Sequence, residues 1–341
     1  YAHSSPKKPM PRRWSTLLLL LLAAPALGAD EAMDVLLKAL FGNPNADFVG
    51  VKQIVLYSGS VAEAIEMEVS CQAEGATRTD YLSPPTMRSR VVIDDGDYLY
   101  SFDPHLEITV RSLSPARVER KLSDAQRREL IGDNYVLSLN NGDTIAGRPT
   151  YRIEVVSREG FTPNRSLWVD RDKFIVLQSK EECGDSAANS SFTWIRYPDE
   201  LDDELFAEEQ FSGEIVEEQP LSAKASTEEL QRRVGIEPVV PPELPGGFIL
   251  VEQMLTRRDG ATYAVHLSYT DGLEGLSVFE EKAGNRSLVG QSITLGGTDL
   301  HLNRSANYSV LQWSHGGVTF TLVGQLTRYG LLQIAGALIH Y

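Results

Sequence analysis

The sequence predicts an α+β protein that is mostly antiparallel β and is divided into two domains. Three observations predict it: short strand-like runs with one apolar face, Asp-Gly turns between some of them, and a change of composition near Leu201. The chain has 341 residues, more than the roughly 250–300 at which a single core stops growing. We therefore expect two cores.

Residues 1–29 carry a leader and a targeting signal. Arg12 and Arg13 precede an apolar run from Leu17 to Leu27, and small residues follow it. This pattern is typical of a secretory signal peptide, with cleavage expected near Ala29. Because the run is far shorter than the ~20 residues that cross a bilayer, we expect an exported protein that is soluble after cleavage.

Residues 30–205 form the first predicted domain. An amphipathic helix opens it, and a Gly-Asn-Pro-Asn turn ends that helix. The apolar residues at helical spacing are Met33, Leu36, Leu37, Leu40 and Phe41. A second helical segment begins at the cap-type residues Ser123 and Asp124, and Asp95-Gly96 is a hairpin signal. The strand-like runs are 48–57, 64–72, 88–95, 97–103, 106–113, 151–158, 165–171, 173–182 and 191–198.

Side chains alternate between apolar and polar along these runs, so each strand has one dry face. The residue pattern leaves two interpretations open: an ordinary core between sheet and helices, or a curved sheet that encloses an apolar cavity. The inward-facing apolar positions are our candidates for a ligand cavity. They are Ile54, Ile65, Met67, Val69, Tyr98, Tyr100, Phe102, Ile153 and Val155.

A linker at residues 206–240 and a second domain at 241–341 follow. The stretch 201–220 carries eight carboxylates and no basic residue, and Ser226 with Glu229 predicts a short capped helix. In the second domain we expect seven strands and a closing helix, a small α+β architecture, which Pro241, Pro242, Pro245 and a Gly-Gly pair introduce. Phe248, Tyr269 and Phe279 are expected to be structural.

The composition and the motifs exclude several functions. A net charge of −15 and a pI near 4.9 repel phosphate backbones, so nucleic acid is not an expected partner. The chain has no GxSxG, HExxH, CxxC, P-loop or GxGxxG motif, and its histidines have no metal-ligand spacing. The clusters Asp94, Asp95, Asp97 and Asp170, Asp172 fit turn chemistry. We predict a binding protein without catalytic residues, cofactor or metal.

The two cysteines leave one structural question open. Cys71 and Cys183 belong to a chain with an export signal, and exported chains enter compartments where a disulfide can persist. A bridge and two separate buried thiols are both compatible with the sequence.

Particular motifs resemble one known family. In 145–182, Gly147-Arg148-Pro149 leads into a strand, Leu167–Asp172 ends the next strand, and Leu177–Lys180 ends a third. Leu244–Phe248 is followed by Tyr269–Leu273 and Ser277-Val278-Phe279, and Phe48-Val49-Gly50 lies in the first strand. These stretches resemble the MucB/RseB family, in the expected order, although residues 58–145 carry no motif that matches it.

The resemblance implies a fold and a function. Family members are periplasmic proteins whose larger domain is similar to the lipoprotein-carrier fold, an open half-barrel sheet with helices on its concave face. They bind the periplasmic part of a membrane-spanning anti-sigma factor, restrain its proteolysis, and can be released by a lipid or lipopolysaccharide signal. A homo-oligomer is also compatible with the resemblance. The alternative is a periplasmic lipid or lipoprotein carrier, which the one-sided apolar strands support but which usually lacks a second domain.

Overall fold

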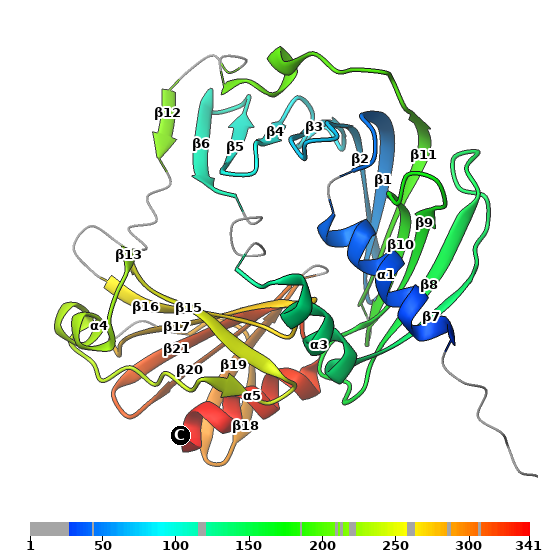
Figure 1. Ribbon diagram of the computed structural model, residues 1–341. Helices are drawn as coiled ribbons and strands as arrows, with labels where there is room; N and C mark the ends of the chain where they lie inside the picture. The colour runs from blue at the N-terminus through cyan, green and yellow to red at the C-terminus, as the bar shows by residue number, and fades with distance from the viewer. Residues whose placement is uncertain are drawn as a thin grey trace, which may run out of the picture.

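The computed structural model describes residues 27–42, 44–114, 121–184, 186–208, 211, 214–217, 223–257, 263–284, 288–305 and 308–341 (Figure 1). Within these ranges a 12-stranded sheet and a nine-stranded sheet form two domains that contact each other. The strands are mostly antiparallel, which confirms the predicted α+β class.

The first sheet is an open half-barrel, because its edge strands β7 and β12 do not pair with each other. The strand order is β12-β6-β5-β4-β3-β2-β1-β11-β10-β9-β8-β7, and Figure 1 shows the sheet as an arch. Its strands are β1 (Phe48–Ser58), β2 (Val61–Cys71), β3 (Thr77–Ser83), β4 (Val91–Asp94), β5 (Tyr98–Asp103), β6 (Ile108–Leu113), β7 (Tyr135–Asn141), β8 (Thr150–Ser157), β9 (Asn164–Asp170), β10 (Val176–Cys183), β11 (Ser186–Arg196) and β12 (Glu214–Glu217).

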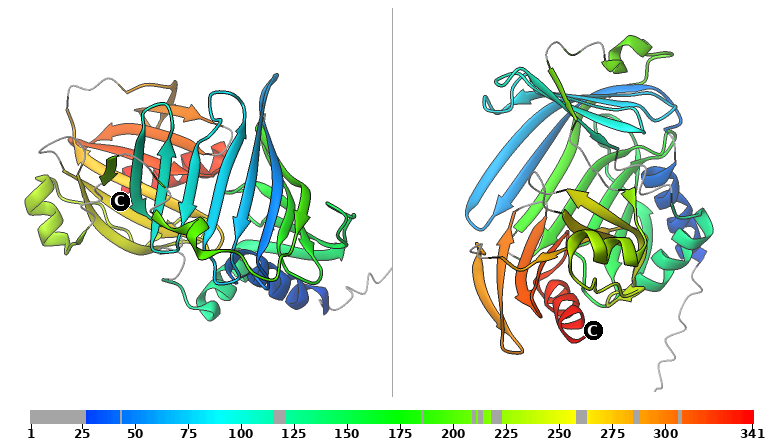
Figure 2. Two further views of the ribbon diagram at one scale, coloured as in Figure 1. Left: turned by 90° about the horizontal axis from the view of Figure 1, so that it is seen from above. Right: turned by 90° about the vertical axis from the view of Figure 1, so that its left-hand side faces the viewer.

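Two helices cover the inner side of one limb of the arch, which we call the concave face of the sheet. They are α1 (Leu27–Phe41) and α3 (Asp124–Asn134), which lie side by side in Figures 1 and 2. Leu36 of α1 and Ile131 of α3 pack with Ile153 and Val155 of β8 in one buried cluster. The apolar spacing of α1 therefore buries one helical face against the sheet, as predicted.

The outer side of the arch carries a convex strap, which is residues 201–208 and 211 and includes the 3-10 helix η1 (Asp203–Phe206). Leu201 and Phe206 are buried with Val49, Ile93 and Tyr100. The acidic side chains of the strap lie between these apolar anchors, so the segment can cover the sheet and keep most of its carboxylates in water.

The predicted linker 206–240 is therefore wrong as a separate element. β12 pairs in parallel with β6 of the first sheet, while β13 (Ala223–Lys224) pairs with β15 (Phe248–Arg257) of the second. The short helix α4 (Thr227–Val234), with the predicted N-cap Ser226, buries Leu230 in the core of the second domain. A few apolar residues attach the acidic stretch to both domains. The prediction missed them because it relied on the average composition of the stretch.

The second sheet has the order β13-β15-β16-β17-β21-β20-β19-β18, and β14 adds to β15. The helix α5 (Arg328–His340) lies against it in both views of Figure 2. Trp313 stacks on Phe320 with ring centroids 5.1 Å apart, and Phe248 and Tyr269 are buried in the same core. The remaining strands are β14 (Glu243–Leu244), β16 (Tyr263–Thr270), β17 (Gly275–Lys282), β18 (Gln291–Leu295), β19 (Thr298–Arg304), β20 (Ser309–His315) and β21 (Val318–Gly324).

Two motifs of the resemblance, Gly147-Arg148-Pro149 and Leu167–Asp172, meet at the buried carboxylate of Asp170. Asp170 is fully buried and accepts hydrogen bonds from Arg148 Nε at 2.8 Å, Tyr197 Oη at 2.8 Å and the backbone N–H of Asp172 at 2.8 Å. Burial alone would raise the pKa of Asp170, but these donors hold it below its ordinary value. Asp170 and Asp172 therefore form the predicted turn, and Asp170 also forms an ion pair with Arg148 from another turn.

We expect Asp170→Asn to lower the free energy of unfolding by about 2–3 kcal/mol at pH 7, because Arg148 loses a charged acceptor. Because the pKa of Asp170 is lowered on folding, its contribution is present at neutral pH and disappears in acid. Urea unfolding at pH 7 and at pH 3 measures both. Asp172→Asn is the control, because Asp172 also contacts Arg148 but is 66% exposed. Equal losses for the two variants would contradict the prediction.

Candidate functional site

The two domains meet along a domain seam, formed by Asn134, Tyr135, Phe161 and Arg165 of the first domain and Gly246, Gly247, Asp271 and Glu274 of the second. These residues come from the end of α3, from β7 and β9, from the loop after β8, and from two turns of the second domain. The seam is the candidate functional site, because it fixes how the two domains face any shared partner.

Phe161 is the apolar anchor of the seam. It belongs to the first domain in sequence but lies in the core cluster of the second, and it is 5% exposed. Its ring meets that of Tyr329 edge-on, with centroids 5.3 Å apart. The backbone N–H of Thr327 donates to the Phe161 carbonyl at 2.9 Å. The second domain thus completes its core with a side chain from the first.

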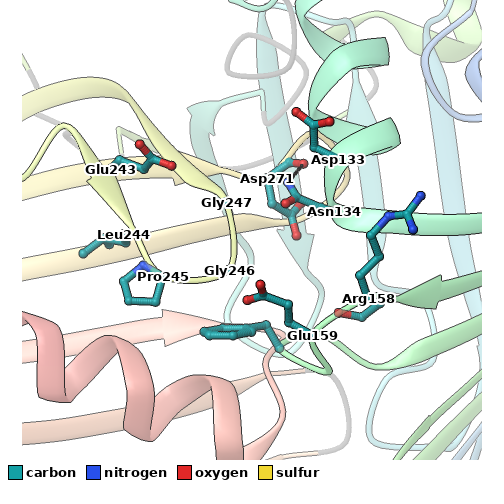
Figure 3. A pocket seen from close by; sticks show the side chains of 12 residues that line it. Asp133, Asn134, Arg158, Glu159, Glu243, Leu244, Pro245, Gly246, Gly247 and Asp271 are labelled. Atoms are coloured by element: carbon teal, nitrogen blue, oxygen red, sulfur yellow. Dashed lines mark hydrogen bonds between the residues drawn. The ribbon is translucent and has the colours of Figure 1, made fainter.

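The Gly246-Gly247 turn brings the second domain against this anchor. Both glycines have positive φ, +83° and +73°. A Cβ on Gly246 would lie 2.6 Å from the Phe161 ring, and one on Gly247 would lie 2.0 Å from Asn134 Oδ1. The Asn134 amide in turn donates to the Asp271 carbonyl at 2.9 Å (Figure 3). The glycines therefore permit both the backbone conformation and the close contact.

We expect Gly247→Ala to weaken domain docking by about 2 kcal/mol or more, because a strained φ is combined with a clash against Asn134. Gly235→Ala is the matched control: Gly235 has nearly the same φ of +74°, and a Cβ there would meet no atom within 4 Å. Hydrogen exchange of the Thr327 amide, whose acceptor lies across the seam, measures docking. If both variants speed this exchange equally, the clash is unimportant.

The proline stretch before the glycines is anchored within the second domain. Tyr269 Oη donates to the Pro241 carbonyl at 2.9 Å, and Glu280 accepts from the backbone N–H of Val239 at 2.9 Å. Glu280 is fully buried, and burial raises its pKa to about 8. The proline-rich segment is therefore fixed to the core of the second domain and leads the chain from there to the seam.

Buried polar groups form the second half of the seam. Tyr135 Oη donates to Asp271 Oδ2 at 2.6 Å and accepts from Thr162 Oγ1 at 3.1 Å. Burial raises the pKa of Asp271, although the Tyr135 hydrogen bond opposes that change. Burial also raises the pKa of Tyr135, so it stays a neutral donor. On α3, buried Arg127 donates to the Gly272 carbonyl at 3.1 Å.

Arg165 links carboxylates of both domains. It pairs with Glu181 of β10 at 2.9 Å and with Glu274 of the second domain. All three side chains are less than a fifth exposed. Burial raises the pKa of Glu274 to about 7; Arg165 opposes the rise, while Asp271 and Glu181 add to it. One guanidinium is thus shared between two carboxylates across the seam.

A cavity of about 360 Å³ opens beside the seam (Figure 3). Its charged lining is acidic apart from Arg158, whose guanidinium donates to the Gly132 carbonyl at 3.2 and 3.3 Å. The lining carboxylates are Asp133, Glu159, Glu243 and Asp271. Basic groups fit such a cavity better than anionic ones.

Six of the nine cavity candidates point to the concave face. Ile54 pairs with Ile65 across β1 and β2, and Met67 and Val69 follow on the same side. Ile153 and Val155 lie under α1 and α3, where they are ordinary core at 0% and 1% exposure. The β1–β2 positions are partly exposed except Met67, at 7%.

The other three candidates are misplaced. Pairing from β2 through β3 and β4 puts Tyr98, Tyr100 and Phe102 on the convex side, where Phe211 of the convex strap lies beside Tyr100 at 6.2 Å and Phe102 at 5.9 Å. The prediction of one shared inward face is therefore wrong for these aromatics. Alternation groups side chains within a strand, but the register between strands decides which groups share a face.

Lys52 is a concave-face residue that the search for apolar positions missed. It lies opposite Met67 of β2 and Phe192 of β11, and its ammonium is 5.7 Å from the Phe192 ring centroid. Burial lowers its pKa. The signal in the sequence was a basic residue at an inward position of an alternating strand.

The two cysteines are free, so the disulfide left open by the sequence is not formed. Cys71 pairs with Phe48 at the start of β1. Cys183 pairs with Ser186 of β11, and Ser186 pairs in turn with Ser58 at the end of β1. Ten residues of strand separate these positions by about 33 Å, far beyond disulfide reach. Burial, with Asp47 nearby, raises the pKa of Cys71 to about 12, which makes it unreactive.

The described ranges contain no group of three or more His, Cys, Asp or Glu side chains placed to hold a metal. None of the helices described is both long enough and apolar enough to span a membrane. Residues 1–26 of the predicted leader and signal lie outside the described residues, whereas the cleavage site expected near Ala29 falls in the first turn of α1.

The arch with two helices on its concave face, docked to a smaller α+β domain, defines a two-domain half-barrel protein. The chain has the fold of MucB. The Pseudomonas aeruginosa MucA/MucB complex matches with a TM-score of 0.55 and 20% identity over 89% of this chain and 97% of that one. MucB in complex with MucA(peri) matches at 0.54 and 19%, covering 90% and 96%. MucB alone matches at 0.52 and 18% with the same coverage. No family model and no curated protein sequence matches the chain.

Proposed function

We propose that this chain is a periplasmic regulatory binding protein that binds the periplasmic part of a membrane-spanning anti-sigma factor and restrains its proteolysis. The observation that carries the proposal is the likeness over both domains to MucB, which has been solved in complex with MucA(peri). A carrier would need only the half-barrel, whereas this likeness covers about 90% of the chain and so includes the second domain.

The seam supports a partner that contacts both domains. Phe161 and Arg165 fix the two surfaces relative to each other, so a partner segment can meet both without first ordering them. The acidic lining of the seam cavity favours a segment with Lys or Arg side chains, and such contacts would weaken with salt.

The experiment uses the purified chain and the periplasmic fragment of a single-span protein encoded beside its gene. We expect a complex by calorimetry and slower digestion of the fragment by an added protease. The double variant Glu159→Gln/Glu243→Gln should bind more weakly with a smaller salt dependence, and Glu66→Gln/Glu68→Gln on β2 is its control. A Kd weaker than about 1 mM, together with unchanged digestion, would overturn the proposal.

The alternative is a lipid or lipoprotein carrier, and the same concave surface would serve a lipid signal that releases the partner. It is supported by Ile54, Ile65 and Val69 on the concave face beside the partly buried side chain of Lys52. Such a surface suits an apolar chain with an anionic head. Binding of a fluorescent fatty acid that Lys52→Met weakens would favour it. No co-purified lipid and no probe binding would exclude it.

A further inference from the structure

The seam buries more negative than positive charge between the two domains. Glu274 faces Arg165 of β9, Glu181 of β10, Asp271 of its own turn and the Tyr135 hydroxyl of β7. Arg127 of α3 donates to the adjacent Gly272 carbonyl, and the neutral partners of the group are Asn134, Thr162 and Gln325. Three carboxylates therefore lie among two largely buried guanidinium groups, and Arg165 pairs with two of the three.

The surplus of buried negative charge favours protonation of one of the carboxylates. Arg165 can neutralise one of its two carboxylate partners, and the Tyr135 hydroxyl can only hydrogen-bond to Asp271. Burying a carboxylate without a counter-charge is unfavourable, so the docked state of lowest free energy keeps a proton on one of the three carboxylates. In the separated domains the same groups would face water and ionise near the ordinary value for Glu, about 4.3.

We propose that docking of the two domains is linked to proton uptake by the Asp271–Glu274 turn, so that acid tightens the seam and neutral to alkaline pH loosens it. The pKa of Glu274, raised to about 7 by burial and by its acidic neighbours, supports this direction. Because the docked state holds the proton more tightly, docking weakens as pH rises from the ordinary Glu value towards 7, and it is constant above that. The proposal concerns the chain itself and does not depend on the identity of a partner.

The Thr327 amide is a direct reporter. Its acceptor, the Phe161 carbonyl, lies across the seam at 2.9 Å, so seam opening releases it. We expect its protection factor, corrected for intrinsic exchange, to fall on the order of 100-fold between pH 5 and pH 8 in the complete chain. Protection of the Val278 amide, inside the second sheet, reports global unfolding of that domain.

Two isosteric variants decide the source of the effect. Glu274→Gln removes the proposed titrating group and should make Thr327 protection nearly independent of pH. Glu280→Gln removes another buried carboxyl with a raised pKa, outside the seam, and should leave the pH dependence of Thr327 intact. A wild-type protection factor that does not change with pH would overturn the proposal without any variant. So would equal pH dependence in the wild type and Glu274→Gln.

Discussion

Replacing Phe161 with alanine is expected to lower the free energy of unfolding by about 3–5 kcal/mol and to open the seam. The side chain is 5% exposed and fills the core of a domain to which it does not belong in sequence. Its loss leaves a cavity at the point where the Thr327 amide and the Tyr329 ring meet the first domain. Urea unfolding should change from one transition to two, and Thr327 exchange should speed up.

Phe206→Ala is the matched control for Phe161→Ala. Phe206 is similarly buried, at 7% exposure, but it anchors the convex strap to its own domain. We expect a loss of comparable size with no change in Thr327 exchange. If Phe161→Ala destabilises the chain while the Thr327 amide stays protected from exchange, the ring contributes only to core packing and does not hold the domains together.

Arg165→Met is expected to cost about 3–5 kcal/mol at pH 7, because it leaves Glu181 and Glu274 buried without their cation. The cost should shrink at pH 5, where Glu274, with its pKa raised to about 7, is protonated. Chemical unfolding at the two pH values measures the difference.

Arg152→Met provides the comparison for Arg165→Met. Arg152 lies on the neighbouring strand β8 and pairs with Glu154, but it is 44% exposed. Such a pair contributes at most about 1 kcal/mol, with little dependence on pH in this range. A loss for Arg165→Met no larger than that of Arg152→Met would mean that solvent reaches the seam charges.

Strand pattern and turn chemistry predict most of this fold, because they depend on local spacing. Every predicted strand run has a counterpart, and the capped helix at Ser226 forms as expected. Five strands were missed: β3, which is largely polar; β7, which follows α3 without a break; β12, which lies among carboxylates; and the two-residue strands β13 and β14. Their pairing comes from neighbouring strands, and the local sequence carries little of it.

The candidate site was harder to predict, because it is made by contacts between distant segments. Tyr98 was assigned to the wrong face because three strand pairings decide its side. Glu274 and Arg165 are 109 positions apart in the chain and look like ordinary surface charges until the domains dock. Phe161 did leave a signal, since it is a large apolar residue in a loop between Gly160 and Pro163.

The division of the acidic stretch between β12 and β13 makes the connection between the domains a short tether. Glu217 belongs to the first sheet and Ala223 to the second, so only residues 218–222 join them, a reach of at most about 20 Å. A domain on so short a tether stays at an effective concentration in the millimolar range. Redocking is therefore intramolecular and independent of dilution, and a ligand that opens the seam must compete with that local concentration.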